Sequence, residues 1–313
     1  MAKGNNYGLR TRDLGKAGQF AMNNAAREGS ASYATAAAVG ERWQAFAAFA
    51  KGEGVKRLEG VTEQLVASYA QSIAATVKAG DRSPAYGQNL VSAVNSVMSL
   101  VTQGEWKSVS PTKDGGIAAR DNVRTEAPQG LNRGDVTAIT DGMHINGQAR
   151  GAVIIELARD LGLRTKEGSL LNAQQALKEG SERGWVTISE GTKGGRMREV
   201  PITHQNQLET LAKAAAIQGN HRSLVPSAQT WAQWRAGGLR QARETLQANG
   251  ISRIHELRSA YAVERYHTLT GQLPKMMGGN ADKAADRAAR LVVAGELGHA
   301  RIAITVSYLG SMK

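Results

Sequence analysis

The last part of the chain holds a histidine and a tyrosine at a spacing that could serve catalysis. His299 follows Leu297 and Gly298, and Tyr308 comes nine residues after His299. A phenol is a poor nucleophile unless a base or cationic surroundings assist it. Basic and imidazole groups lie upstream, at Arg164, Lys193, His255 and Arg258. If folding gathers them, they suit attack of the Tyr308 oxygen on a phosphodiester, because cations stabilise the charge that develops on phosphorus.

Arg164 stands at a predicted helix junction, directly after Gly162 and Leu163. A guanidinium between apolar turns is partly buried and needs an anionic partner. Glu167 lies three residues further on, which is the same face of a helix. Two interpretations stay open. The pair is a structural ion pair, or Arg164 binds a phosphate bidentately while Glu167 supports it.

His255 and Arg258 are three residues apart near the start of a predicted helix, so both side chains lie on one face. Lys193 falls in a glycine-rich turn, where a mobile ammonium could protonate a leaving oxygen. Arg196 and Arg198 follow the turn, and we expect them to contact a nucleic-acid backbone.

The composition limits the class of protein. The chain has 313 residues, of which 41% are hydrophobic, and its net charge is +12. There are no cysteines, which excludes disulfides and thiolate metal sites. The sequence predicts neither a transmembrane helix nor a secretory signal in its first 18 residues. The basic charge favours a polyanionic partner, most simply nucleic acid.

The first half of the chain reads as helical. Residues 30–106 contain three predicted helices, which begin near Ser32 or Thr35, at Thr62 and at Ser83-Pro84. Residues 1–29 are expected to form a separate segment that could be flexible, and residues 107–134 a linker.

The second domain is expected over residues 135–313. It begins with an apolar helix over residues 148–161, and a further helix is expected from Arg164 to about Leu177. Two short strands, over residues 185–188 and 198–202, are predicted to form a hairpin. The remainder is mostly helical, with a Gly-rich insert over residues 271–286 that we expect to be a surface loop or an added helix.

The ordered set of motifs resembles the tyrosine recombinases, also called phage-type integrases. The resemblance rests on Arg164 in Gly-Leu-Arg-Thr-Lys-Glu, Lys193 in a β-hairpin, the His255-x-x-Arg258 pair, Leu297-Gly298-His299, and Tyr308. It covers residues 135–313 closely and residues 30–105 less specifically. It implies a mainly α fold with a small β-hairpin (α+β), in which a helical, SAM-like core-binding domain precedes the catalytic domain.

The resemblance also implies roles for these residues. Arg164 and Arg258 would bind the nonbridging oxygens of a scissile phosphate, and His255 and His299 would hydrogen-bond to it. Lys193 would protonate the departing 5′-hydroxyl, and Tyr308 would become a 3′-phosphotyrosine. The reaction would need no metal or other cofactor. Glu167 matches an acidic support position.

The implied partner is double-stranded DNA, bound by a homotetramer on two DNA sites, with possible accessory DNA-bending proteins and no membrane. The implied location is the cytoplasm, at the nucleoid, for a bacterial or phage-encoded protein. Integration or excision of a mobile element is favoured by the 271–286 insert and the long N-terminal segment. A chromosome- or plasmid-dimer resolvase, a type IB topoisomerase-like enzyme and a non-catalytic DNA-binding regulator remain alternatives. Many family members carry another helix after the tyrosine, whereas here only Leu309 to Lys313 follow Tyr308.

Overall fold

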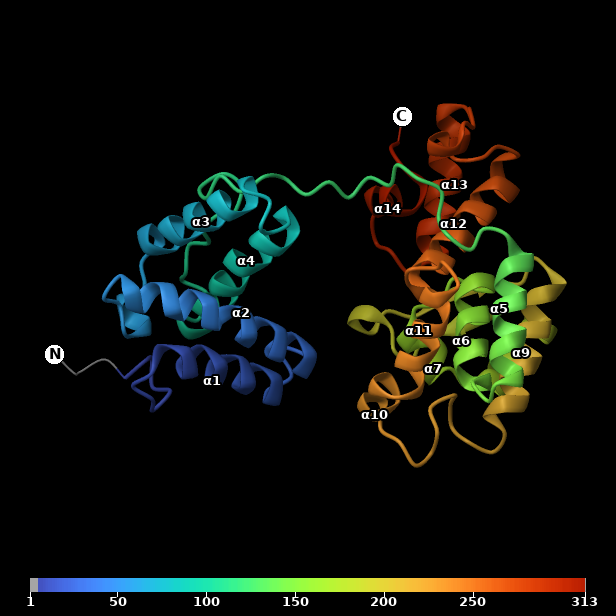
Figure 1. Cartoon of the computed structure of the whole chain (residues 1–313), viewed down its shortest axis with the longest axis horizontal. Coiled ribbons are helices and arrows are strands. Elements are labelled where there is room, and N and C mark those ends of the chain that lie inside the picture. Colours follow the sequence, from blue (N-terminus) through green and yellow to red (C-terminus); the bar gives the residue numbers. More distant parts are fainter. Residues whose placement is uncertain (1–4, 313) are drawn as a thin grey trace. The chain divides into compact units, whose positions relative to one another are not determined.

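The structure is a computed structural model that describes residues 5–312, and the chain divides into two compact units between Asp121 and Asn122 (Figure 1). The first unit contains helices α1 (Leu14–Arg27), α2 (Tyr33–Gly52), α3 (Glu63–Lys78) and α4 (Pro84–Val101), with a short 3₁₀ helix, η1 (Leu58–Gly60). The boundary lies inside the stretch expected as a linker.

The expected helix starts of the first unit are confirmed. The side chains of Ser32, Thr62 and Ser83 each accept a hydrogen bond from a backbone N–H in the first turn of α2, α3 and α4. These caps satisfy donors that a helix leaves unpaired at its start. The core between the helices is aromatic, because the Phe46 ring lies 5.0 Å from that of Trp43 and 5.3 Å from that of Tyr69.

Helix α1 lies in the segment that the sequence suggested could be flexible, of which residues 1–4 lie outside the described residues. It packs along α2 (Figure 1), and Trp43 Nε1 donates a hydrogen bond of 2.9 Å to the carbonyl of Leu14. Its buried face consists mostly of small residues such as Ala17 and Ala25. Residues of the expected linker also pack here, because Val109 and Ile117 are buried in this core.

The second unit is mainly helical and includes one two-stranded antiparallel sheet. Its elements are α5 (Arg133–Ile145), α6 (Ala149–Asp160), α7 (Thr165–Leu170), α8 (Ala173–Arg183), β1 (Trp185–Ile188), η2 (Lys193–Gly195), β2 (Arg198–Pro201), α9 (Gln205–Gln218), α10 (Trp231–Ala236), α11 (Gly238–Ala248), α12 (Ile254–Thr270), η3 (Lys275–Met277), α13 (Lys283–Glu296), η4 (Ile302–Thr305) and α14 (Val306–Leu309). The mainly α fold with a small β-hairpin is therefore confirmed.

The hairpin has the expected position, with Trp185 opposite Pro201 and Ile188 opposite Arg198. The helix expected from Arg164 to Leu177 is instead two helices, α7 and α8. The break comes at Leu171 and Asn172, where the Asn172 side chain accepts a hydrogen bond from Gln175 N and starts α8. An asparagine side chain competes with the helix backbone in this way, so it ends one helix and caps the next.

The core of the second unit surrounds α6, which is buried along almost its whole length, from Gly151 to Asp160. Helix α12 packs against it, and α13 packs against α12. The expected insert over residues 271–286 forms the loop after α12, the helix η3 and the first turn of α13. Met276 and Met277 of η3 pack against the core. None of the helices in the described part of the chain is both long and apolar enough to cross a membrane.

Candidate active site

Helix α12 carries His255 and Arg258 on one face, near its N-terminus. His255 is exposed, whereas Arg258 is almost completely buried, with an exposed fraction of 1%. The Arg258 guanidinium donates hydrogen bonds to the backbone carbonyls of Gly162 and Leu297. Because these carbonyls come from two other segments, Arg258 joins the end of α6 to the end of α13.

Arg164 begins α7 and points toward the same carbonyl. Its Nη2 donates a hydrogen bond of 3.3 Å to Leu297 O, to which Arg258 also donates. The backbone N–H and Nη1 of Arg164 donate to the two carboxylate oxygens of Glu167, at 2.7 and 2.6 Å. Two guanidiniums from different helices thus converge beside one backbone oxygen.

Glu167 is fully buried and holds a second arginine in addition to Arg164. Arg198 donates from Nη1 and Nη2 to its two oxygens, at 2.8 and 2.7 Å. Burial by itself would raise the pKa of Glu167, but hydrogen bonds and positive charge from Arg198 and Arg164 lower it to about 2. Glu167 is therefore an anion at neutral pH, and it aligns both arginines.

The end of α13 forms the next side of the cluster. Gly298 has φ +66°, and the N–H of His299 donates 2.8 Å to Ala294 O, which closes the helix. A Cβ on Gly298 would lie 3.0 Å from Cδ of Arg198, so a side chain here would be strained and crowded. The turn brings the Leu297 carbonyl to the arginines and His299 to the tyrosine.

Tyr308 lies on α14 with an exposed fraction of 3%, and its hydroxyl is surrounded by the other groups. The oxygen is 3.1 Å from His299 Nε2 and 3.5 Å from His255 Nε2, and Arg258 Nε donates to it at 3.4 Å. The ring stacks on that of His255 at 5.4 Å with an interplanar angle of 17°. The structure thus assembles a phenol, two imidazoles and two guanidiniums in one place.

Burial and the positive surroundings together determine the charge of the histidines. Burial, and then the charges of Arg258, Arg164 and Arg198, lower the pKa of His299 to about 4. Partial desolvation, followed by the charge of Arg258, lowers the pKa of His255. Both imidazoles are therefore neutral at pH 7, and either ring has a nitrogen free to accept the phenol proton.

Arg258 stays charged at neutral pH. Burial lowers the pKa of Arg258 to about 10, which is still well above neutrality. A phosphodiester at this position would therefore meet the Arg258 guanidinium, which donates to the Tyr308 hydroxyl, and the Arg164 guanidinium, which donates to the same Leu297 carbonyl as Arg258. This arrangement suits stabilisation of a negatively charged transition state.

Two of the expected residues lie outside the cluster. Lys193 is in η2 at the turn of the hairpin and is exposed; within the described residues it makes no hydrogen bond or ion pair with the cluster. Arg196 is also exposed on the hairpin. Both positions leave their side chains open to a ligand in solution.

Arg198 differs from the expectation that it would contact DNA. Its exposed fraction is 7%, and besides Glu167 it donates from Nε to Glu296 O at 2.7 Å. The physical reason is the alternation of β2, in which Arg198 and Val200 face inward and Glu199 faces outward. That alternation is the signal by which the sequence could have revealed that Arg198 is buried.

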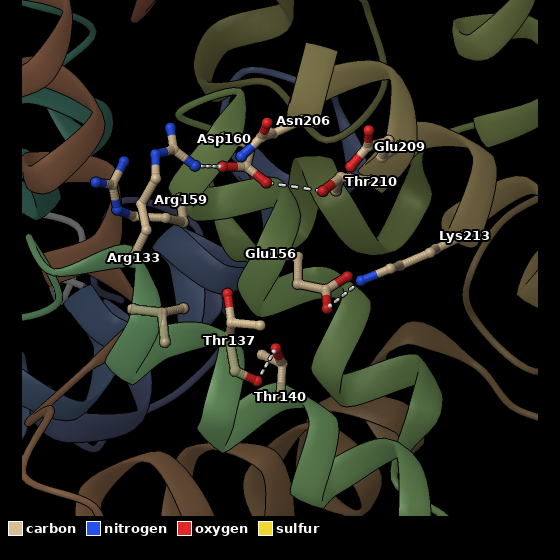
Figure 2. A pocket seen from close by; sticks show the side chains of 11 residues that line it. Arg133, Thr137, Thr140, Glu156, Arg159, Asp160, Asn206, Glu209, Thr210 and Lys213 are labelled. Atoms are coloured by element: carbon tan, nitrogen blue, oxygen red, sulfur yellow. Dashed lines mark hydrogen bonds and ion pairs between the residues drawn. The ribbon is translucent and has the colours of Figure 1, made fainter. Parts of the chain in front are cut away.

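A separate polar cavity lies between α5, α6 and α9 of the second unit (Figure 2). Arg133 forms an ion pair with Asp160, and Lys213 forms one with Glu156 at 3.3 Å. Thr210 donates a hydrogen bond of 2.7 Å to Asp160. The cavity contains no residue of the Tyr308 cluster. Among the described residues, no group of three or more His, Cys, Asp or Glu side chains is arranged to hold a metal ion.

The chain is similar to known proteins in part of its sequence and in its fold. Residues 136–264 match the family model described as Integrase. The fold is similar to that of the Tn1549 transposon integrase in complex with transposon right end DNA (12% identity, 95% of each chain covered, TM-score 0.61). It is also similar to the XerH site-specific recombinase bound to palindromic difH substrate in a post-cleavage complex (18% identity, 96% of this chain and 81% of that chain, TM-score 0.58).

A third similar structure is a lambda integrase tetramer bound to a Holliday junction (16% identity, 90% of this chain and 74% of that chain, TM-score 0.53). No curated protein matches the sequence. At these identities the solved structures establish the fold, and the family model supplies the relation in sequence. The chain is therefore similar in sequence to the integrase family over residues 136–264, and it has the fold of these solved recombinases and integrases.

Proposed function

We propose that this protein is a site-specific DNA recombinase that cuts and rejoins duplex DNA through a covalent bond to Tyr308. The observation that carries the proposal is the position of the Tyr308 hydroxyl, within 3.5 Å of His299 Nε2, His255 Nε2 and Arg258 Nε. A surface or core tyrosine has no need of two neutral imidazoles and a buried cation at its oxygen. A nucleophile that must lose its proton next to a phosphate does.

Residues of this chain can carry out each part of the cleavage step. The Tyr308 oxygen attacks phosphorus as its proton passes to His255, the O–P bond to tyrosine forms, and the bond from phosphorus to the 5′-oxygen breaks. Arg164 and Arg258 bind the nonbridging oxygens, and His299 donates a hydrogen bond to the phosphate. Lys193, on the exposed turn, protonates the departing 5′-oxygen.

Rejoining is the same reaction in reverse. The 3′-phosphotyrosine keeps the energy of the broken ester, so the 5′-hydroxyl of another strand displaces Tyr308 without an external energy source. The proposed reaction therefore needs no cofactor or metal. Glu167 acts by holding Arg164 and Arg198, and Arg196 contacts the DNA backbone from the exposed hairpin.

The proposed biological role is integration or excision of a mobile element by a homotetramer on two DNA sites. Similarity to a transposon integrase and to the lambda integrase tetramer supports this role. The similar XerH structure makes resolution of DNA dimers the second candidate. The protein would act in the cytoplasm, on the nucleoid, with accessory DNA-bending proteins where its sites require them.

The test begins with duplexes selected from a random pool by binding to the protein. A nick placed a few nucleotides 3′ of the cleavage site lets the short product dissociate, which traps the covalent complex. The expected result is a DNA adduct on Tyr308 through a 3′-phosphate, as identified by mass spectrometry. Tyr308→Phe should lose the adduct and retain binding.

Further assays separate the activities. Recombination between two selected sites, compared with relaxation of a supercoiled plasmid that lacks them, separates a recombinase from a topoisomerase. Intermolecular joining of two different sites supports integration, and resolution restricted to two sites on one plasmid supports a dimer resolvase. Binding without an adduct in the wild-type protein would contradict the proposed reaction.

A further inference from the structure

The backbone around Tyr308 is held by an arginine that does not touch the Tyr308 hydroxyl. Arg290 of α13 has an exposed fraction of 0%. Its Nη1 donates a hydrogen bond of 3.0 Å to Gly310 O. Its Nη2 donates hydrogen bonds of 3.1 Å to Ser311 O and 3.4 Å to Leu309 O. One guanidinium therefore binds the carbonyls of the three residues that follow the tyrosine.

The same guanidinium also binds the residue that precedes α14. Arg290 Nη1 also donates 3.3 Å to Thr305 Oγ1, three residues before Tyr308. The five donors of an arginine are fixed in one plane, so groups bound to them cannot move independently. Residues 305–311 are thus tied at both ends to one side chain.

Arg290 is itself held firmly in place. Its Nε donates to both oxygens of Asp286, at 2.9 and 3.0 Å, and Tyr266 donates 2.8 Å to Asp286 Oδ1. A buried charge that loses its partners is strongly destabilising, so the guanidinium keeps this orientation. Asp286 belongs to the part of the chain expected as an insert, which gives that segment a structural purpose.

A second set of contacts also holds this segment. Arg124 N donates 2.9 Å to Val306 O, and the Arg124 guanidinium binds both oxygens of Glu256, beside His255, at 2.8 and 2.9 Å. Gly310 has φ +74°, and a Cβ there would lie 3.0 Å from both Arg124 O and Met276 Cβ. The chain passes through a space that only glycine fits.

We propose that Arg290 is a positioning residue that places the Tyr308 nucleophile against the phosphate site of its own subunit. This inference rests on the proposed function. Arg290 acts through the backbone of residues 305–311 and makes no contact with the reacting atoms. Its loss should therefore slow attack by Tyr308 and leave phosphate binding by Arg164 and Arg258 unchanged, because small errors in the position of a nucleophile cost much rate.

The test variant is Arg290→Lys, which keeps a charge opposite Asp286 and loses the planar fork. The matched control is Arg287→Lys, on the exposed side of the same helix. Single-turnover formation of the covalent complex should fall about 10- to 100-fold for Arg290→Lys and stay within about twofold for the control. DNA affinity should stay within about twofold for both variants. Gly310→Ala, which crowds the same segment without removing a charge, should behave like Arg290→Lys.

A second measurement distinguishes a misplaced Tyr308 from general damage to the phosphate site. In a Tyr308→Phe background, hydrogen peroxide supplies a small oxygen nucleophile that attacks a phosphate bound by the same arginines. Nicking by peroxide should be lost in Arg258→Ala and remain within about twofold when Arg290→Lys is added. Equal losses of tyrosine-dependent and peroxide-dependent cutting, or a covalent-complex rate within twofold of wild type, would overturn the proposal.

Failure of the proposed function gives a different result. If the wild-type protein forms no covalent complex at all, the recombinase reaction is refuted and the positioning role falls with it. If wild type reacts and only Arg290→Lys is unaffected, the recombinase proposal stands and the positioning role alone is wrong.

Discussion

The hydroxyl of Tyr308 and Nε2 of His299 lie 3.1 Å apart, in a cluster where burial and positive charge together keep the imidazole neutral. Burial lowers the pKa of His299, and Arg258 and Arg164 lower it further, to about 4. A histidine with this pKa in the folded protein is deprotonated throughout the physiological range. The neutral imidazole and the Tyr308 hydroxyl are therefore joined by a hydrogen bond.

The first prediction concerns this titration in the DNA-free protein. The His299 ring, followed by NMR, should titrate with a midpoint near pH 4, below the value of about 6.5 for an unperturbed histidine. Arg258→Gln should move the midpoint upward, because it removes the nearest positive charge. A midpoint between pH 6 and 7 in the wild-type protein would contradict the charge environment described for this cluster.

The second prediction separates the two hairpin arginines. Arg198→Met should lower the free energy of unfolding by about 3–5 kcal/mol, because it leaves the buried Glu167 without its bidentate partner. Arg196→Met should leave stability within about 0.5 kcal/mol. For this exposed residue the expected effect is on DNA binding, where the slope of log affinity against log salt should fall by about 1.

Urea unfolding and salt-dependent binding curves check both variants, and each variant serves as the control for the other. An unfolding free energy for Arg198→Met close to that of wild type, combined with a reduced salt slope, would show that Arg198 contacts DNA after all. It would also mean that the Glu167 pair contributes little to stability.

The third prediction concerns Lys193 as the proton donor to the leaving group. Lys193→Ala should slow cleavage of an ordinary phosphodiester by about 10²–10⁴-fold. A substrate with sulfur in place of the bridging 5′-oxygen releases a thiolate, which needs no proton. Cleavage of that substrate by Lys193→Ala should approach the wild-type rate. Equal losses on both substrates would assign Lys193 to binding.

The fourth prediction follows from the lowered pKa of Glu167. Its pKa in the folded protein is about 2, below the value of 4.5 expected after unfolding, so its contribution to stability is present above pH 4.5 and is lost as the pH falls toward 2. The shift corresponds to about 3 kcal/mol at full ionisation. Glu167→Gln should lower stability at pH 7 and flatten the decline in stability between pH 4.5 and 3. The measurement is the free energy of unfolding from urea curves at a series of pH values. If it declines below pH 4.5 as steeply in Glu167→Gln as in wild type, this assignment is wrong.

The sequence predicts local structure well where the signals lie within one element. Ser32, Thr62 and Ser83 cap helices as their types suggest, and the hairpin follows from two short strands around a glycine-rich turn. His255 and Arg258 share a face because the helix repeat requires it. These features depend on neighbours that are close in the sequence.

Other features depend on contacts between distant segments and are not contained in any local pattern. The Leu297 carbonyl, which accepts from both Arg164 and Arg258, has no side-chain signature. Arg290 stands on the apolar stripe of α13, three residues before Val293, and this is a visible sign of burial. What it binds follows only from the path of the chain after Tyr308.

The hairpin that carries Lys193 is fixed at one end and open at the other. Its base is anchored where Arg198 lies in the interior against Glu167, whereas its turn lies in solvent. An exposed turn on an anchored base would let Lys193, the proposed proton donor, move while Arg198 stays aligned with Glu167. Substitutions at the turn should therefore change the rate at which the leaving group is protonated. They should leave the ion pair between Arg198 and Glu167 intact.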